Sequence, residues 1–186
     1  MEPPKRKRNR LDDWDYSAPG YYFITVCTLG HRCLFWESRV GADIIRPEHL
    51  SLSRAGVLVE QGILSIPRHY SGISLEKYVI MPNHIHLILR ILDTCGRMIS
   101  APTQPLLTRK PIPVVIGQMK RFVSKQLGHP IWQKSFYDHV IRNEADYLRI
   151  WAYIDQNPAK WREDCYYEEG TCEEGKDHSP ENRILP

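Results

Sequence analysis

Residues 81–89 read Met-Pro-Asn-His-Ile-His-Leu-Ile-Leu, an apolar run interrupted by two histidines. Side chains two positions apart in a strand point to the same face, so His84 and His86 leave one face together while Ile85 and Leu87 occupy the other. Two adjacent imidazoles can share one cation. Alternatively, they only hydrogen-bond to neighbours within a partly buried edge strand. The His-Ile-His pattern therefore predicts a strand that carries a candidate metal site.

The composition sets the class of protein. A chain of 186 residues is long enough for one domain with a substantial core. No apolar run reaches the length of a membrane span, and no apolar signal segment follows the basic N-terminus, so we expect a cytoplasmic protein with no membrane partner. The five cysteines are odd in number and form no Cys-x-x-Cys pair, which favours free thiols.

The net charge of +3 conceals an uneven distribution along the chain. From Glu163 onward there are eight acidic and two basic residues, so the first 162 residues carry a net charge of about +9. This excess favours a polyanionic partner such as nucleic acid, although solubility is the simpler explanation. We expect a flexible basic arm (1–10), one folded domain (11–162) and an acidic tail (163–186) that is disordered or loosely docked. The tail could mimic DNA and inhibit, or it could have no role, and the second interpretation is favoured.

Hydrophobic periodicity predicts the order of the secondary structure. Strands are expected at 21–28, at 73–81, from His84 onward and at 132–142; the strand that begins at His84 is expected to pair with 73–81 as a hairpin. Helices are expected from Ser51 or Ser53 to about Ser65, stopped by Pro67, and then at 114–127 and 144–156, with a long loop over 93–113. This order favours an α+β fold, and its repeated βαβ units favour a ferredoxin-like antiparallel sheet with helices packed mainly on one face.

The last predicted helix, capped by Asn143, separates its side chains into two groups. At about 100° per residue its apolar stripe contains Tyr147, Leu148, Ile150, Trp151 and Ile154. Arg149, Tyr153 and Asn157 instead share a polar face.

Tyr153 is therefore either a half-buried surface tyrosine or a nucleophile. A phenol has a pKa near 10, so covalent catalysis requires that the phenol or its target be activated. A cation held by His84 and His86 could polarise a phosphodiester, and Asn157, one turn beyond Tyr153, could add an oxygen ligand.

Four segments together resemble a known family. Residues 79–86, Val-Ile-Met-Pro-Asn-His-Ile-His, resemble the HUH signature of single-strand transposases. Residues 153–158, Tyr-Ile-Asp-Gln-Asn-Pro, resemble the Tyr-Ile-x-x-Asn-Pro segment that carries their nucleophilic tyrosine. Segments 20–28 and 132–142 also match, so the resemblance covers about residues 10 to 162. The chain is most similar to the REP-associated tyrosine transposases, relatives of the insertion-sequence transposases.

The resemblance implies a ferredoxin-like fold of the HUH endonuclease type that nicks and joins single-stranded DNA, often hairpins of repetitive extragenic palindromes. It implies that Tyr153 attacks a phosphodiester, forms a 5′-phosphotyrosine link and frees a 3′-OH, a step that a second 3′-OH can reverse. It also implies that His84, His86 and Asn157 hold Mg²⁺ or Mn²⁺. Two imidazoles alone would suit a softer metal such as zinc, but a phosphate substrate supplies hard ligands.

Other interpretations remain open at this stage. Tyr137 lies beside His139 and is a rival nucleophile, although a strand tyrosine more often serves packing. The chain could also be a DNA-binding module that has lost cutting, or a metal-dependent hydrolase that uses water. The expected partner is single-stranded or hairpin DNA, bound by a monomer or homodimer. The candidates for phosphate contacts are Lys5, Arg6, Lys7, Arg8, Arg10, Lys120, Arg121, Lys125 and Arg149.

Overall fold

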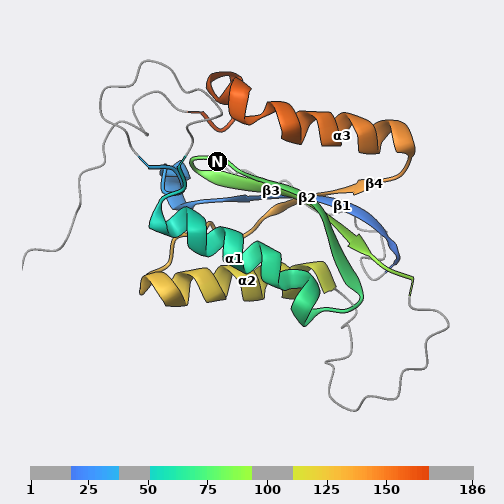
Figure 1. Cartoon of the computed structure of the whole chain (residues 1–186), viewed down its shortest axis with the longest axis horizontal. Helices are drawn as coiled ribbons and strands as arrows, with labels where there is room; N and C mark the ends of the chain where they lie inside the picture. Colours follow the sequence, from blue (N-terminus) through green and yellow to red (C-terminus); the bar gives the residue numbers. More distant parts are fainter. Residues whose placement is uncertain (1–17, 38–50, 94–110, 168–186) are drawn as a thin grey trace, which may run out of the picture.

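The computed structural model describes residues 18–37, 51–93 and 111–167, which form a four-stranded antiparallel sheet with helices on both sides (Figure 1). The elements follow in the order β1 (Gly20–Cys27), η1 (Leu29–His31), α1 (Arg54–His69), β2 (Ile73–Ile80), β3 (His84–Ile91), α2 (Pro111–Leu127), β4 (Tyr137–Ile141), α3 (Glu144–Gln156) and η3 (Pro158–Glu163). The α+β class and the predicted order of strands and helices are confirmed.

The sheet has the strand order β2-β3-β1-β4, and each neighbouring pair is antiparallel. β2 and β3 pair as the predicted hairpin. β3 lies between β2 and β1, so the histidine strand is an interior strand and not an edge. The register sets Thr25 of β1 opposite His86 and Cys27 opposite His84, and directly opposed residues share one face of a sheet.

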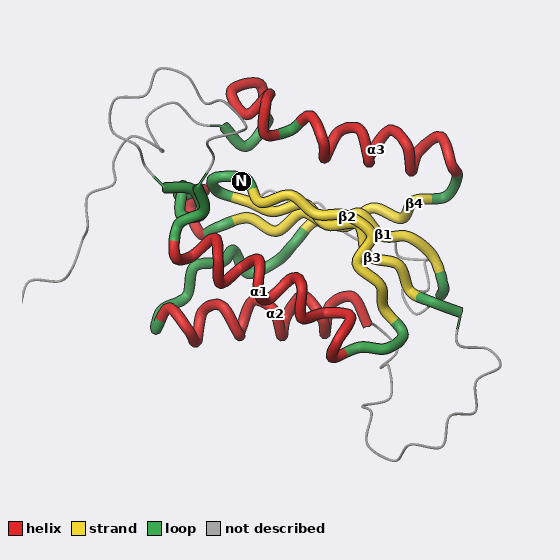
Figure 2. Tube along the Cα trace, in the orientation of Figure 1, coloured by secondary structure: helices red, strands yellow, loops and turns green. Residues whose placement is uncertain are grey.

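The two faces of the sheet are covered by different helices, as Figure 2 shows. The expectation that helices pack mainly on one face holds for α1 and α2, which enclose the larger core with residues such as Ile24 and Leu87. α3 covers the opposite face, where Phe23 and Ile88 pack against Ile150 and Ile154. β3 is buried at seven of its eight positions, as expected of a strand covered on both faces.

Several predicted boundaries are wrong. α1 continues through Pro67 to His69, because a proline in the last turn removes one backbone donor while Tyr70 N–H still bonds to Ile66 O. α2 begins at Pro111, since prolines are tolerated in a first turn whose N–H groups have no helical partner. β4 begins only at Tyr137; Trp132 instead forms an isolated bridge with Thr28.

Three further observations complete the fold. Cys27 and Cys165 are free, as expected, but Cys33 is disulfide-bonded. The predicted basic arm, most of the predicted 93–113 loop and the acidic tail beyond residue 167 lie outside the described residues. None of the helices that the structure describes combines the length and the apolarity needed to cross a membrane.

Candidate metal and tyrosine site

The two histidines lie side by side beneath the C-terminal end of α3. Their side chains point to the α3 face of the sheet, and their Nε2 atoms are 3.0 Å apart. His84 is 0% and His86 1% exposed. Burial lowers the pKa of His84 to about 4, with Asp164 opposing the shift, and lowers the pKa of His86 well below its usual value. Both imidazoles are therefore neutral at pH 7 and keep a lone pair for a cation.

The outer nitrogen of each ring is held by a neighbouring side chain. His84 Nδ1 lies 2.8 Å from Asn83 Oδ1, and the Asn83 amide is oriented because its Nδ2 donates to the carbonyls of His31 and Tyr166. Since an amide oxygen only accepts, His84 carries its proton on Nδ1 and presents a lone pair at Nε2. His86 Nδ1 lies 2.8 Å from the Thr25 hydroxyl.

The Thr25 hydroxyl can either donate or accept a hydrogen bond, so it suits both tautomers of His86. With the proton on His86 Nε2, that proton bridges to His84 Nε2. With the proton on Nδ1, both Nε2 atoms offer lone pairs to one cation. Two ligands that meet an octahedral cation at right angles, each at about 2.1 Å, are about 3.0 Å apart. The observed separation of 3.0 Å therefore fits a shared metal ion.

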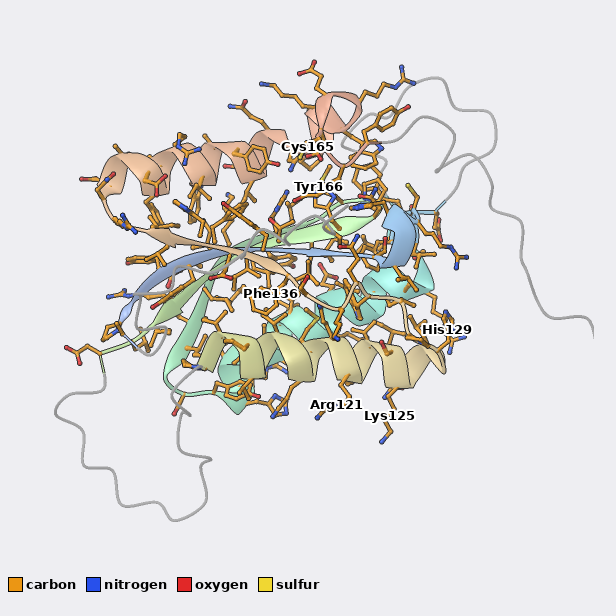
Figure 3. All side chains as sticks on the ribbon, turned by 180° about the vertical axis from the view of Figure 1, so that it is seen from behind. Arg121, Lys125, His129, Phe136, Cys165 and Tyr166 are labelled. Carbon is orange, nitrogen blue, oxygen red and sulfur yellow. The ribbon has the colours of Figure 1, made fainter. Side chains whose placement is uncertain are left out.

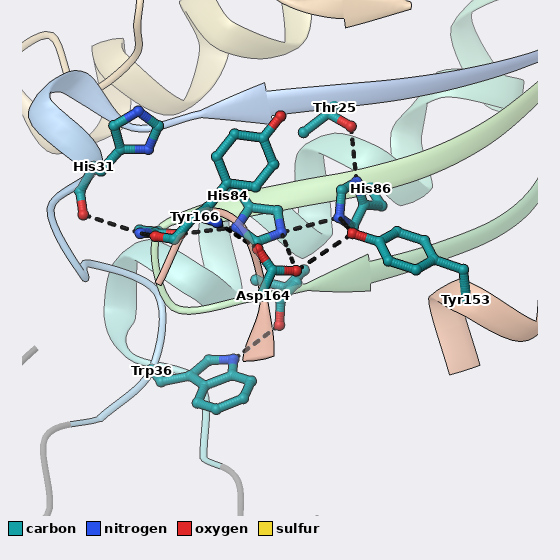
Figure 4. Close-up of polar contacts among 10 residues, drawn as sticks. Thr25, His31, Trp36, His84, His86, Tyr153, Asp164 and Tyr166 are labelled. Carbon is teal, nitrogen blue, oxygen red and sulfur yellow. Dashed lines mark hydrogen bonds and ion pairs between the residues drawn. The ribbon is translucent and has the colours of Figure 1, made fainter. Parts of the chain in front are cut away.

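Tyr153 reaches the same point from α3. Its hydroxyl lies 3.2 Å from His86 Nε2 and donates to Asp164 Oδ2 at 3.3 Å (Figure 4). Its ring contacts Phe23 edge to face with 6.2 Å between centroids, and the side chain remains 39% exposed. Burial and then the charge of Asp164 raise the pKa of the Tyr153 phenol. The phenol is thus protonated at neutral pH and has a carboxylate positioned to accept its proton.

Asp164 is a site residue that the sequence interpretation missed. Its side chain is 1% exposed, its Oδ2 lies 4.0 Å from His84 Nε2, and its Oδ1 accepts from the backbone N–H of Tyr166. Within the described residues, His84, His86 and Asp164 form a group whose donor atoms all lie within 4.8 Å of one another. The first residues of the predicted acidic tail therefore lie at the candidate site.

The short helix η3 returns the chain to the histidines. The ring centroids of Trp161, within η3, and His84 are 6.0 Å apart. The ring of Tyr166 lies 4.7 Å from that of His84 and 5.6 Å from that of His31, between centroids (Figure 4). These aromatic residues cover the imidazoles. A signal was present in the sequence, because aromatic side chains inside an acidic run indicate docking and not a fully solvated tail.

Asn157 is buried, at 3% exposure, and forms the C-terminal cap of α3. Its amide partly opposes the rise in the pKa of the Tyr153 phenol, although its Nδ2 atom has no partner that meets hydrogen-bond geometry. The amide therefore lies near the phenol with an unused polar atom, and its role as a ligand stays a prediction. The predicted apolar stripe of α3 is wrong at Leu148, which is 57% exposed.

The predicted phosphate contacts lie in several places. Arg121 and Lys125 point outward from α2, on the far side of the sheet from the histidines (Figure 3). Lys120 does not face out: its Nζ donates to the carbonyls of Gln133 and Ser135, and burial lowers its pKa to about 8. Arg149 is on α3 and donates to Asp146. The residues from Lys5 to Arg10 lie outside the described part of the chain.

Comparisons with known proteins support the resemblance seen in the motifs. No protein-family model matches the chain. An uncharacterised Haemophilus influenzae protein is 30% identical over 174 residues, which span 87% of this chain and 93% of the relative. A putative REP-associated tyrosine transposase of the same organism is 32% identical over 85 residues, which span 44% of this chain and 47% of that relative.

Two solved structures are similar at a lower level. A REP-associated tyrosine transposase bound to a REP hairpin has a TM-score of 0.46 at 20% identity, over 76% of this chain and 68% of that one. A putative transposase from Deinococcus radiodurans has a TM-score of 0.41 at 14% identity, over 82% and 97%. The chain belongs to one family with the Haemophilus influenzae protein that it matches over most of its length, and its resemblance to the REP-associated tyrosine transposases is confirmed.

Proposed function

We propose that this protein is a transposase-like enzyme that nicks single-stranded DNA and transfers the strand through a covalent link to Tyr153. The position of the Tyr153 hydroxyl, 3.2 Å from His86 Nε2 in a cluster of potential metal ligands, carries the proposal. A tyrosine that only packs in the core gains nothing from placing its hydroxyl beside metal ligands. A tyrosine that only faces solvent does not contact a buried histidine. The named transposase among the relatives supports the same class of activity.

The proposal also includes the type of fold and the DNA partner. The βαββαβ order and the strand order β2-β3-β1-β4 support a ferredoxin-like fold of the HUH endonuclease type. The basic charge of the first 162 residues supports DNA as the polyanionic partner. A partly exposed tyrosine beside buried histidines suits an unpaired strand better than a rigid duplex, and we propose single-stranded or hairpin DNA as the substrate.

His84 and His86 are the proposed metal ligands, and Asn157 is the proposed third ligand, with Asp164 as its competitor for that position. Imidazole and oxygen donors together suit Mn²⁺, or Mg²⁺ when the phosphate supplies further oxygens. When bound, the cation would polarise the phosphodiester and stabilise the charge that develops on its oxygens. Asn83 and Thr25 hold the rings so that both Nε2 atoms face one point.

The chain's own groups account for the proton balance of the reaction. The Tyr153 oxygen forms a bond to phosphorus as its proton passes to Asp164 Oδ2, which already accepts that hydrogen bond. The bond from phosphorus to the 3′ oxygen breaks, the leaving oxygen takes up a proton from solvent to become a 3′-OH, and Asp164 releases its proton to solvent. The DNA keeps a 5′-phosphotyrosine link, and attack by another 3′-OH restores the phenol and joins the strands. No nucleotide cofactor is required, since the covalent link retains the energy of the broken bond.

The direct test is a covalent adduct between protein and labelled hairpin DNA, resolved on a denaturing gel in the presence of Mn²⁺ or Mg²⁺. We expect an adduct with the wild-type chain, its loss on chelation of the metal, and its loss in Tyr153→Phe, which removes only the hydroxyl. Tyr137→Phe is the matched control, because Tyr137 is a 47% exposed tyrosine on β4, opposite Thr25 in the sheet, and should still form the adduct.

Each competing function gives a different result in the same experiment. Cut DNA with no adduct would identify a hydrolase that uses water. DNA that is bound but neither cut nor linked would identify a binding module. An adduct that persists in Tyr153→Phe and disappears in Tyr137→Phe would transfer the role of nucleophile to the strand tyrosine.

A further inference from the structure

A cavity lies at the opposite end of α3 from the histidines. It has a volume of about 390 Å³ and is lined by Tyr21, Ile141, Arg142, Asn143, Glu144 and Tyr147. This volume is within the range of sites for small organic groups. The cavity is formed where β1 begins, β4 ends and α3 starts. Tyr21 precedes Thr25 by four residues of β1, so the cavity lies about 13 Å along the strand from His86.

Two flat aromatic rings line this cavity, and a guanidinium group packs on one of them. The rings of Tyr21 and Tyr147 meet edge to face at 5.1 Å between centroids, and Tyr147 also packs against Trp151 at 5.6 Å. The Arg90 guanidinium lies over the Tyr21 ring at 5.1 Å. Single-strand-binding proteins use such rings to stack bases and such cations to hold the backbone. A simple anion would not require the tyrosines, and Glu144, which also lines the cavity, would repel it.

The edge strand β4 connects the cavity to the histidine site. Tyr137, His139 and Ile141 alternate along β4 and therefore share its α3-facing side. Tyr137 lies opposite Thr25, which bonds to His86, whereas Ile141 lies opposite Tyr21 and lines the cavity. Tyr137 is 47% and the His139 side chain 39% exposed. A strip of accessible rings thus runs from one site to the other.

We propose that this cavity binds an unpaired base of the DNA strand whose phosphodiester lies at Tyr153, and so positions that strand for attack. The proposal rests on the proposed DNA-processing function. The base stacks on Tyr147 and Tyr21, and its flanking phosphate lies toward Arg90. Glu144 accepts a hydrogen bond from an exocyclic amino group, so the cavity prefers cytosine or adenine to thymine.

The first test measures the affinity of the full chain for single-stranded oligonucleotides of dA, dC or dT about twelve nucleotides long, which is within the usual site size of single-strand binders. Tyr147→Leu keeps an apolar side chain but removes the ring, and should weaken dA and dC binding by about five- to a hundredfold, the range for one lost base stack. Leu148→Ala, at the adjacent and 57% exposed position, should bind as wild type. Equal affinity of Tyr147→Leu and wild type would overturn the proposal.

The second test requires no variant. Oligonucleotides with one photoreactive bromouracil at successive positions are cross-linked to the wild-type chain, and the linked peptide is identified by mass spectrometry. Cross-links to the peptide of Tyr21 or Tyr147 support the proposal, and cross-links confined to other peptides overturn it. Neither measurement depends on strand cleavage. A protein that binds bases here but forms no adduct would refute the nicking function and leave the base-binding cavity established.

Discussion

The two faces of one sheet differ sharply in chemistry although they are built from alternating residues of the same strands. On the α1/α2 face, Ile85 and Leu87 of β3 are 0% exposed and join a large, almost entirely apolar core. On the α3 face, their neighbours His84 and His86 are equally buried but polar, and the apolar cluster there is small. The comparison indicates that the two faces have different roles. The α1/α2 face stabilises the fold, whereas the α3 face holds buried polar groups whose desolvation is unfavourable.

His86→Ala and Leu87→Ala test this division at adjacent positions, one on each face. His86→Ala should reduce adduct formation by about a thousandfold or more, because a cation contributes several kcal/mol to phosphoryl chemistry. Its free energy of unfolding should fall by less than that of Leu87→Ala, because the lost packing is partly offset by removing the cost of burying a polar ring. Adduct formation under saturating Mn²⁺ and denaturant unfolding are the two measurements.

Leu87→Ala should give the opposite result. Removing a fully buried leucine from the α1/α2 core should lower the free energy of unfolding by about 2–5 kcal/mol. Adduct formation at a temperature where the variant stays folded should remain near the wild-type level. If Leu87→Ala abolishes the adduct while folded, or His86→Ala unfolds the chain, the two faces do not divide function and stability.

Asp164→Asn tests the residue that the tail contributes to the α3 face. The change keeps the side-chain volume but removes the carboxylate that accepts the phenol proton, so adduct formation should fall by about a hundredfold at saturating metal. Asn157→Ala should instead raise the Mn²⁺ concentration needed for half-maximal adduct formation. The reverse pattern, with Asp164→Asn changing the metal requirement and Asn157→Ala having no effect, would make Asp164 the third ligand.

The sequence predicted the first half of the site because that half depends on local geometry. Period-two alternation places His84 beside His86, the cap at Asn143 is confirmed by its bond to Asp146 N–H, and helical spacing keeps Tyr153 off the buried stripe. Asp164 depends on the path of η3, which no periodicity determines. The covering of the α3 face could have been predicted from the continuous apolar run of β3, which suits a strand buried on both sides.

Thr25→Val tests how much the orientation of one imidazole matters. Valine fills the space of threonine but cannot bond to His86 Nδ1, so the ring loses the partner that fixes its orientation. Metal affinity should fall by about ten- to a hundredfold, measured as the Mn²⁺ requirement for adduct formation.

Thr28→Val removes another fully buried hydroxyl, one that bonds to the carbonyls of Arg32 and Asn83, and should leave the metal requirement closer to that of wild type. Equal shifts in the two variants would mean that general packing, and not the Thr25 contact, sets metal affinity.

The smallest expected effect concerns the first turn of α3, where Asp146 joins the helix to β4. A hydrogen bond to His139 lowers the pKa of the Asp146 carboxyl, with a further contribution from Arg149 and opposition from burial. A carboxyl whose pKa is lower in the folded state stabilises the fold above its unfolded pKa of about 3.9, and this stabilisation is lost as the pH falls through the folded pKa.

Asp146→Asn should therefore unfold more easily than wild type at pH 7, by no more than about 1 kcal/mol for such partly exposed pairs. The difference should disappear in acid, once the pH has fallen below the folded pKa of Asp146. Glu144→Gln removes the same charge from the same turn, so if both variants show one pH profile, the helix dipole and not the His139 contact stabilises this end of α3.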